Sequence, residues 1–385
     1  MSNRRRPGEG SIRQRADGCF EVRFSTGLDL ATGKYRRISK TVQTSEEAVQ
    51  LLTTLRNQNA ACRLKPSAWT VENWYRHWLH TYAQDAVKRS TYVSYEAYLN
   101  NHFGPAIGKL KLKDITPSLL QNFYHEKVAG GLSQKTVMNM NLCLHKCLSQ
   151  AEMEGFLLSN PAAKLNLRRG EKPEILVLTR AQQRLLMEKS RNCRYGVFIR
   201  LVLATGLRMG ELLALQWKDI DLEQSTLYVR RTLNRLKSYK DEGPKTEIVL
   251  GTPKSQNSRR SIPLLPAVVE DLKAWQKIQD ADRLALGSGY AKTDMVVTNE
   301  AGGYIEQTVF RGYYTALLQD AELPHFTFHA LRHTFATRAL EQGMDPKTLS
   351  AILGHYSVAF TLDTYAHVLN EHKHKAISLM ANLYL

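Results

Sequence analysis

Residues 329–335 read HALRHTF, and this short stretch places two histidines four residues apart with an arginine between them. On a helix, His329 and His333 would share a face. A zinc-binding helix of this kind also needs a carboxylate directly after its first histidine, and that position holds Ala330. Arg332 would oppose a bound cation, whereas His329 and Arg332, three residues apart, could both meet one anion. The stretch therefore favours a phosphate site over a metal site, and motifs elsewhere in the chain are needed to distinguish the two.

Composition favours a protein that binds a polyanion. The chain has 385 residues, of which 43% are apolar, so two or three domains with packed cores are expected. Its net charge of +17 and pI near 9.6 predict a polyanionic partner, with nucleic acid ahead of an acidic membrane surface. No run of 18 apolar residues occurs, and the basic N-terminus leads into no apolar signal region. We therefore expect a protein that stays in the cytoplasm and has no membrane partner.

The cysteines predict reduced thiols rather than disulfides. Five of them are scattered along the chain without an even, spaced framework. Cys143, His145 and Cys147 have a spacing that metal ligands could share. The two cysteines lie four residues apart on one predicted helix face and His145 points elsewhere, which favours core packing.

The N-terminal residues 1–62 predict a small β-β-β-α domain. Residues 19–25 read CFEVRFS and alternate apolar with charged side chains, so residues 11–43 are expected to form three short strands. Residues 44–47, TSEE, supply a capping box for a following helix. The polar face of this sheet could enter a DNA major groove, although a simply solvated face is the alternative. The candidate DNA-binding residues on it are Arg13, Arg15, Arg23 and Arg37.

Two further domains follow, and together they predict a mostly helical α+β fold. Residues 67–165 show helical spacing, with cap signals at Thr70, Thr116 and Ser133, which indicates a compact helical domain. The linker KLNLRRGEKPE, residues 164–174, leads to a larger, mostly helical domain over residues 175–385. In it, residues 225–233 and 246–264 alternate like strands of a small antiparallel sheet, the second stretch turning at residues 255–258.

Four motifs of this last domain occur in one order, and the chain resembles the tyrosine recombinases, also called phage integrases. The motifs are ATGLRMGELLALQWKDID at residues 204–221, TPKSQNSRRSIPL at 252–264, HALRHTFAT at 329–337 and LGHYSVAFTLDTYAH at 353–367. Four motifs in one order are far more specific than any one of them.

The resemblance implies a role for each matching residue. Tyr365 would attack a scissile DNA phosphate and form a 3′-phosphotyrosyl link. The catalytic residues implied by the family are Arg208, Lys254, His329, Arg332, His355 and Tyr365. Arginine forks and imidazoles can meet the charge that develops on the phosphate, so no metal or other cofactor is required.

Three of these roles concern protons and orientation. His329 is the candidate base for the tyrosine, and Lys254 is the candidate acid for the leaving 5′-oxygen. Glu211 is expected to orient the cationic groups rather than transfer protons. His333 is expected to pack or to form a structural hydrogen bond.

The layout resembles that of three-domain integrases of phages and conjugative transposons. This implies an N-terminal domain for arm-type sites, a helical core-binding domain and a catalytic domain, acting on double-stranded DNA as a homotetramer. An excisionase or a DNA-bending factor is a possible partner. The apolar tail, residues 376–385, could fold back on its own domain or dock on a neighbouring subunit, and we favour the neighbour.

Two other functions use similar features. A type IB topoisomerase would share the tyrosine intermediate but relax DNA alone. A catalytically silent DNA-binding regulator would keep the charge but would not need all seven matching positions.

Overall fold

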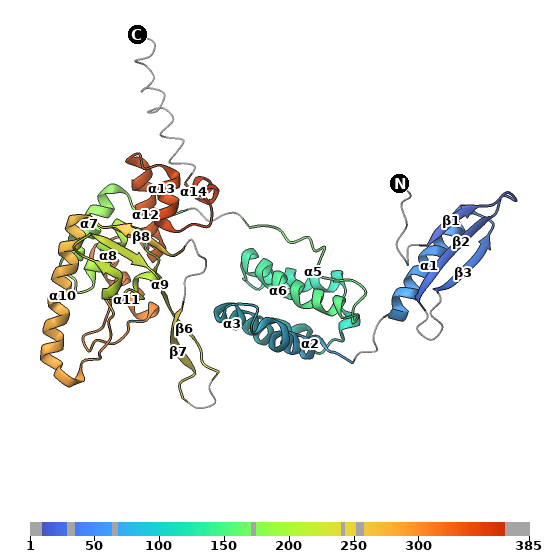
Figure 1. The fold of residues 1–385 in the computed structure, drawn as a ribbon, viewed down its shortest axis with the longest axis horizontal. Coiled ribbons are helices and arrows are strands. Elements are labelled where there is room, and N and C mark those ends of the chain that lie inside the picture. Colours follow the sequence, from blue (N-terminus) through green and yellow to red (C-terminus); the bar gives the residue numbers. More distant parts are fainter. Residues whose placement is uncertain are drawn as a thin grey trace, which may run out of the picture. The chain divides into compact units, whose positions relative to one another are not determined.

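The computed structural model describes residues 10–28, 35–63, 68–170, 175–239, 243–251 and 258–365. The chain divides into two compact units, Met1–Lys172 and Pro173–Leu385 (Figure 1). Lys254, the side chain of Arg37 and the tail at residues 376–385 lie outside the described residues. In the described part, no helix is long and apolar enough to cross a membrane.

The first unit begins with the predicted three-stranded sheet and helix. Strands β1 (Ser11–Gln14), β2 (Phe20–Leu28) and β3 (Tyr35–Val42) pair antiparallel in sequence order, and α1 (Ser45–Arg63) packs on them (Figure 1). The Glu47 backbone N–H donates to Thr44 Oγ1 at 3.2 Å, as in the predicted capping box. The alternation of β2 turns its apolar side chains inward, and the small core consists of Val22, Phe24, Ala48, Leu52 and Leu55.

A helical bundle makes up the remainder of the first unit. Its helices are α2 (Val71–Trp78), α3 (Arg89–Tyr98), α4 (Gly104–Ile107), α5 (Pro117–Ala129) and α6 (Gln134–Met153), with π-helical turns at Leu79–Ala83 and Leu99–Phe103. Hydroxyl caps start α2, α5 and α6 at the predicted positions, Thr70, Thr116 and Ser133. Cys143 and Cys147 are buried in its core, and Cys143 Sγ lies 2.8 Å from the Tyr75 hydroxyl oxygen.

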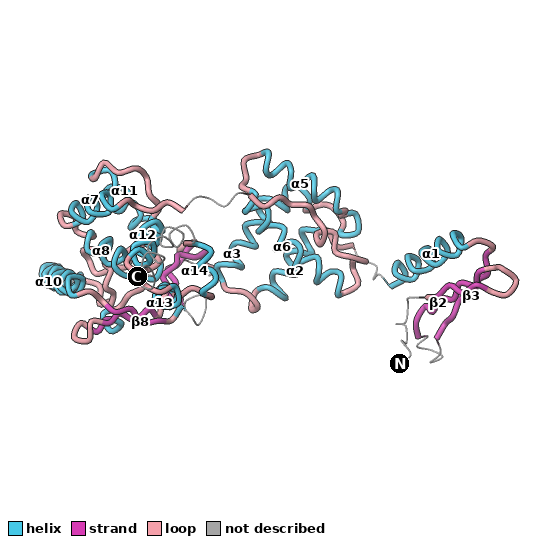
Figure 2. Tube along the Cα trace, turned by 90° about the horizontal axis from the view of Figure 1, so that it is seen from above, coloured by secondary structure: helices cyan, strands magenta, loops and turns pink. Residues whose placement is uncertain are grey.

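The second unit is mainly helical and carries two small sheets (Figure 2). Its helices are α7 (Arg180–Ser190), α8 (Gly196–Thr205), α9 (Met209–Leu212), α10 (Pro266–Leu286), α11 (Gln307–Asp320), α12 (Phe328–Glu341), α13 (Pro346–Leu353) and α14 (Val358–Thr364). Its strands are β4 (Ile220–Asp221), β5 (Thr226–Val229), β6 (Thr232–Lys237), β7 (Thr246–Gly251) and β8 (Arg260–Pro263). The predicted α+β, mostly helical fold class is confirmed.

The pairing of these strands differs from the expected one. The sequence suggested one strand over residues 225–233 and a hairpin over 246–264, but β7 pairs with β6 and β8 pairs with β5. The break between β5 and β6 falls at Arg230 and Arg231, which both form ion pairs with the buried carboxylate of Asp219. Because these arginines turn toward Asp219, the single predicted strand becomes two strands in different sheets.

Helix α8 is the centre of the second unit and positions the residues that follow it. It reads GVFIRLVLAT, is apolar on nearly all sides and packs against α7, α10 and α12. It ends at Gly206 in the left-handed conformation, with φ at +66°. A Cβ at this glycine would lie 2.6 Å from Phe335 and 2.7 Å from Leu353, so only glycine fits here. The close approach brings the loop before α9 against α12 and α13.

Candidate active site

Arg208 lies directly before α9, and its guanidinium is hydrogen-bonded to Glu211. Its Nη1 donates to Glu211 Oε1 at 2.7 Å, and its backbone N–H donates to Glu211 Oε2 at 3.1 Å. The spacing of three residues lets one carboxylate cap the helix and hold the arginine. The side chain of Arg208 is 37% exposed, so part of the guanidinium is open to an incoming anion.

Arg260 completes this cluster, and it was not predicted from the sequence. Its Nη2 donates to Glu211 Oε2 at 2.8 Å, and the two side chains are only 5% and 4% exposed. Burial raises the pKa of Glu211, but the hydrogen bonds and charge of Arg260, with the charge of Arg208, lower it to about 2. The alternation of β8 could have revealed Arg260, because it places this arginine on the same face as buried Ile262.

Arg332 lies inside the unit and connects a loop with the end of a helix. Its Nη1 donates to the Gly206 carbonyl at 2.7 Å and its Nη2 to the Leu353 carbonyl at 2.8 Å, and the residue is 2% exposed. Burial and the neighbouring Arg208 lower its pKa to about 9, so it still carries its charge at neutral pH. One guanidinium thus joins α12 to the loop before α9 and to the end of α13.

Two histidines stand beside these cations and are neutral in the free protein. Partial desolvation and the charges of Arg332 and Arg208 lower the pKa of His329 to about 4. The same causes lower the pKa of His355 to about 3, and His355 Nδ1 lies 2.7 Å from Thr361 Oγ1. A bound phosphate would oppose these causes, because its negative charge favours the protonated imidazoles.

Tyr365 directly follows α14 and is buried. It is 1% exposed, and its backbone N–H donates to the Thr361 carbonyl at 3.0 Å. Burial raises the pKa of its hydroxyl to about 12, against the lowering effect of Arg332. The hydroxyl oxygen lies 2.9 Å from His333 Nδ1.

The fold therefore gathers most of the predicted site residues in the second unit. Hydrogen bonds and charge interactions connect the set Arg208, Glu211, His329, Arg332, His355 and Tyr365. Among the described residues, no group of three His, Cys, Asp or Glu side chains could hold a metal ion.

The N-terminal arginines belong to the first unit. Arg13, Arg15 and Arg23 are exposed, the first two at and just after β1 and the third on β2. Arg23 forms an ion pair with Glu21 at 2.9 Å, and Arg15 pairs with Asp17 at 3.7 Å. This face of the sheet therefore carries carboxylates as well as arginines.

Comparison with known proteins decides the family. Residues 176–372, more than half of the chain, match the phage integrase family, and residues 70–128 match its N-terminal SAM-like domain. The chain belongs to the phage integrase family. It is a tyrosine site-specific recombinase, which breaks and rejoins DNA strands.

Relatives of this recombinase extend over most of its length. A tyrosine recombinase XerC-like protein of Caldanaerobacter subterraneus subsp. tengcongensis is 30% identical, over 80% of this chain and 82% of the relative. The ICEBs1 integrase of Bacillus subtilis is 26% identical, over 96% of this chain and 99% of its own. The integrase of the Tn1549 transposon, solved with transposon right end DNA, has the same fold, with a TM-score of 0.67, 24% identity, and coverage of 82% of this chain and 100% of that one.

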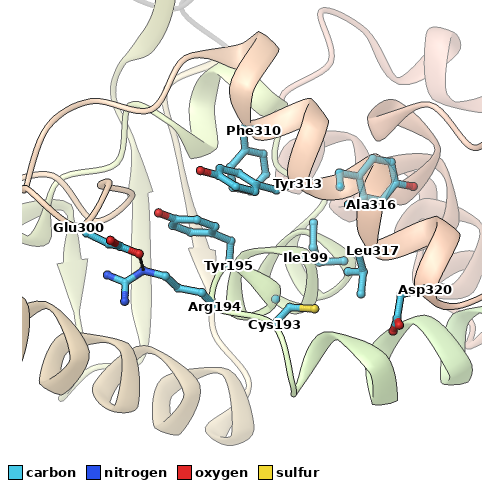
Figure 3. A pocket seen from close by; sticks show the side chains of 12 residues that line it. Cys193, Arg194, Tyr195, Ile199, Glu300, Phe310, Tyr313, Ala316, Leu317 and Asp320 are labelled. Atoms are coloured by element: carbon cyan, nitrogen blue, oxygen red, sulfur yellow. Dashed lines mark ion pairs between the residues drawn. The ribbon is translucent and has the colours of Figure 1, made fainter.

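The recombinase also has a hollow outside the arginine and histidine cluster. A cavity of about 480 Å³ lies between α11 and the segment that leads into α8, and aromatic side chains line it: Tyr195, Phe310, Tyr313 and Tyr314 (Figure 3). At its rim, Arg194 forms a 4.0 Å ion pair with Glu300 (Figure 3). None of the predicted site residues lines this cavity, so its apolar wall does not contribute to the cluster described above.

Proposed function

We propose that this recombinase integrates and excises a mobile DNA element in the bacterial cytoplasm, through a 3′-phosphotyrosyl intermediate and a Holliday junction. The observation that supports this most is the pair of hydrogen bonds from Arg332 to the Gly206 and Leu353 carbonyls. They draw the motif of Arg208 and the motif of His355 and Tyr365 to the helix that carries Arg332. One phosphate could then contact residues from three motifs.

The chemistry needs positive charge and proton transfer. Arg208, Arg332 and His355 would hold the non-bridging oxygens as charge develops on them. Tyr365 would form a bond to phosphorus while the bond to the 5′-oxygen breaks. With its pKa raised to about 12, the phenol needs both a cationic surrounding and a base. His329 is our candidate base, because a bound phosphodiester would raise its pKa from the low value of the free protein.

Glu211 would orient the arginines and take no proton. Its pKa of about 2 keeps it ionised at working pH, and both of its oxygens are occupied by arginine donors. The phosphotyrosyl bond would keep the energy of the broken ester, so a 5′-hydroxyl from a second duplex could rejoin the strands without ATP.

Lys254 is proposed to protonate the leaving 5′-oxygen. Lys254→Ala should slow the cleavage of ordinary DNA by about 100-fold or more, within the usual range for a general acid. It should spare a substrate that has sulfur at the 5′-bridging position, since a thiolate leaves without a proton. Single-turnover cleavage of both substrates measures this, with EDTA present to show that no metal takes part. Equal slowing on both substrates would assign Lys254 to phosphate binding alone.

Residues 1–62 are proposed to bind arm-type sites, residues 67–165 to bind the core site, and residues 175–385 to catalyse. The exposed Arg13, Arg15 and Arg23 support the first assignment. A chain that begins at residue 63 should lose arm-site affinity by at least about tenfold and keep core-site cleavage, because the proposed catalytic residues all lie beyond residue 200. Electrophoretic mobility shifts on separate arm and core duplexes measure the affinities. A folded truncation that cannot cleave the core site would contradict this division.

We also propose that four protomers act on two duplexes. A related lambda integrase has been solved as a tetramer bound to a Holliday junction, and the present chain has that fold with a TM-score of 0.58. An excisionase or a DNA-bending factor would act as an accessory partner in one direction of the reaction.

Recombinant junctions from paired sites test the proposed function. The sites are taken from the two ends of the encoding element and from the junction that excision leaves. We expect joined products from two duplexes and a four-protomer complex by light scattering. Relaxation of supercoils without any junction would indicate a topoisomerase, and binding without either product would indicate a regulator.

A further inference from the structure

His333 is the imidazole that contacts the Tyr365 hydroxyl. The two residues are 32 positions apart, one on α12 and one directly after α14, and His333 Nδ1 lies 2.9 Å from Tyr365 Oη. His329, four residues earlier on α12, has no hydrogen bond to Tyr365 among the contacts of the described residues. The contact therefore belongs to a histidine that the proposed reaction leaves without a role.

We infer that His333 is a positioning residue for the nucleophile, because its Nδ1 accepts a hydrogen bond from the Tyr365 hydroxyl and fixes where that oxygen lies. This inference rests on the proposed function, in which Tyr365 attacks the phosphate.

The direction of the hydrogen bond follows from the surroundings of the hydroxyl. Tyr365 is 1% exposed, and its ring packs in a cluster formed by Ala336, Ala339, Leu340, Leu349 and Leu353. This wall is apolar, and in the described part of the chain His333 is the group that hydrogen-bonds the phenol oxygen. If Nδ1 donated instead, the O–H of the phenol would be buried without an acceptor, which is costly. The phenol therefore donates, and the imidazole proton resides on Nε2.

The protonation states of the free protein agree with this direction of the hydrogen bond. Burial, the neighbouring His329 and Arg332 lower the pKa of His333 to about 4. Burial raises the pKa of the Tyr365 hydroxyl to about 12. In the free protein the proton therefore stays on the phenol, and the neutral imidazole acts only as an acceptor.

The ring of His333 is itself held in place. The His329 and His333 rings meet edge to face, with centroids 4.6 Å apart at 89°. The apolar cluster therefore fixes the phenol ring, and the imidazole pair fixes the direction of its O–H. The proposed phosphate ligands Arg208, Arg332 and His355 form their hydrogen bonds with partners other than His333.

The test compares three substitutions in the full chain on a nicked suicide duplex carrying the core site. His333→Ala removes the acceptor. His333→Asn places an amide oxygen near the Nδ1 position, whereas His333→Gln places its amide near the Nε2 position. We expect His333→Ala to slow single-turnover formation of the covalent adduct by roughly 10- to 100-fold, with affinity for the half-site unchanged. His333→Asn should return the rate to within a few-fold of wild type, and His333→Gln should not.

Several outcomes would overturn this role. A wild-type rate for His333→Ala would show that the contact with Tyr365 does not affect adduct formation. Rescue by His333→Gln rather than His333→Asn would show that Nε2, and not Nδ1, is the nitrogen that matters. If His333→Ala does not fold, as judged by circular dichroism, the comparison of Asn with Gln still decides.

A Tyr365→Phe control separates this inference from the proposed function. Adduct formation by Tyr365→Phe would contradict the nucleophile itself, whatever the His333 variants do. If Tyr365→Phe forms no adduct but His333→Ala forms it at the wild-type rate, only the positioning role of His333 is contradicted.

Discussion

Glu211→Ala is expected to destabilise the second unit by about 3–5 kcal/mol, the usual effect of removing one partner from a buried ion pair. The reason is Arg260, which is 5% exposed and would keep its charge without a carboxylate. Arg208 would also lose the carboxylate that holds its guanidinium at 2.7 Å. For a unit of this size, such a loss corresponds to a midpoint of thermal unfolding lower by roughly 6–20 °C.

Calorimetry of the full chain measures this effect, and an exposed ion pair supplies the matched control. Glu270 pairs with Lys273 at 2.9 Å, with side chains 71% and 49% exposed. Glu270→Ala should change the stability by less than about 1 kcal/mol, because solvent screens such pairs. If Glu211→Ala lowered the stability as little as Glu270→Ala, the ion pairs of Glu211 with Arg208 and Arg260 would not stabilise the site.

The same variant has a defined pH dependence. Folding lowers the pKa of Glu211 from 4.5 to about 2, so its contribution is complete above about pH 4.5 and is lost as the pH falls through about 2. The stability difference between wild type and Glu211→Ala should therefore shrink as the pH falls from 4.5 toward 2. A difference that grows over this range would contradict the ionised state of Glu211.

Local signals in the sequence account for what could be predicted. Thr70, Thr116 and Ser133 start helices because a hydroxyl cap acts within three residues. Residues 19–25 alternate apolar with charged side chains, and this local pattern predicted the first sheet. The order of four motifs indicated the family, and the comparisons confirm it.

Contacts between distant residues account for what could not be predicted. The Glu211–Arg260 pair joins positions 49 residues apart, and no local pattern connects them. The break between β5 and β6 depends on Asp219, a carboxylate that becomes buried only when the domain packs. The contact of His333 with Tyr365 likewise requires α12 and the end of α14 to meet. The sequence led us to expect that His333 packs or forms a structural hydrogen bond, but it did not indicate Tyr365 as the partner.

Tyr365→Phe is expected to abolish the covalent intermediate while leaving core-site affinity within about threefold of wild type. The substitution removes the attacking oxygen and its hydrogen bond to His333 Nδ1. The proposed phosphate ligands Arg208 and Arg332 keep their hydrogen bonds to Glu211, Gly206 and Leu353. A net cost of about 1 kcal/mol in stability is expected for one lost hydrogen bond, so the variant should remain folded.

Tyr313→Phe is the matched control for this variant. Tyr313 is 44% exposed and lines the aromatic cavity of the same unit, away from the arginine and histidine cluster. The Tyr313→Phe protein should form the adduct through Tyr365 at the wild-type rate. An equal loss of adduct in both variants would show that the effect of removing a hydroxyl is general rather than specific to Tyr365.

Trapping on a nicked suicide duplex tests the central claim most directly, because the cleaved strand loses the short piece needed for rejoining and the adduct accumulates. Wild-type protein should become covalently attached to the 3′-phosphate, and peptide mass spectrometry should place the nucleotide on Tyr365. Tyr365→Phe should bind the same duplex and form no adduct. An adduct on any other residue, or one that persists in Tyr365→Phe, would contradict the assignment of Tyr365 as the nucleophile.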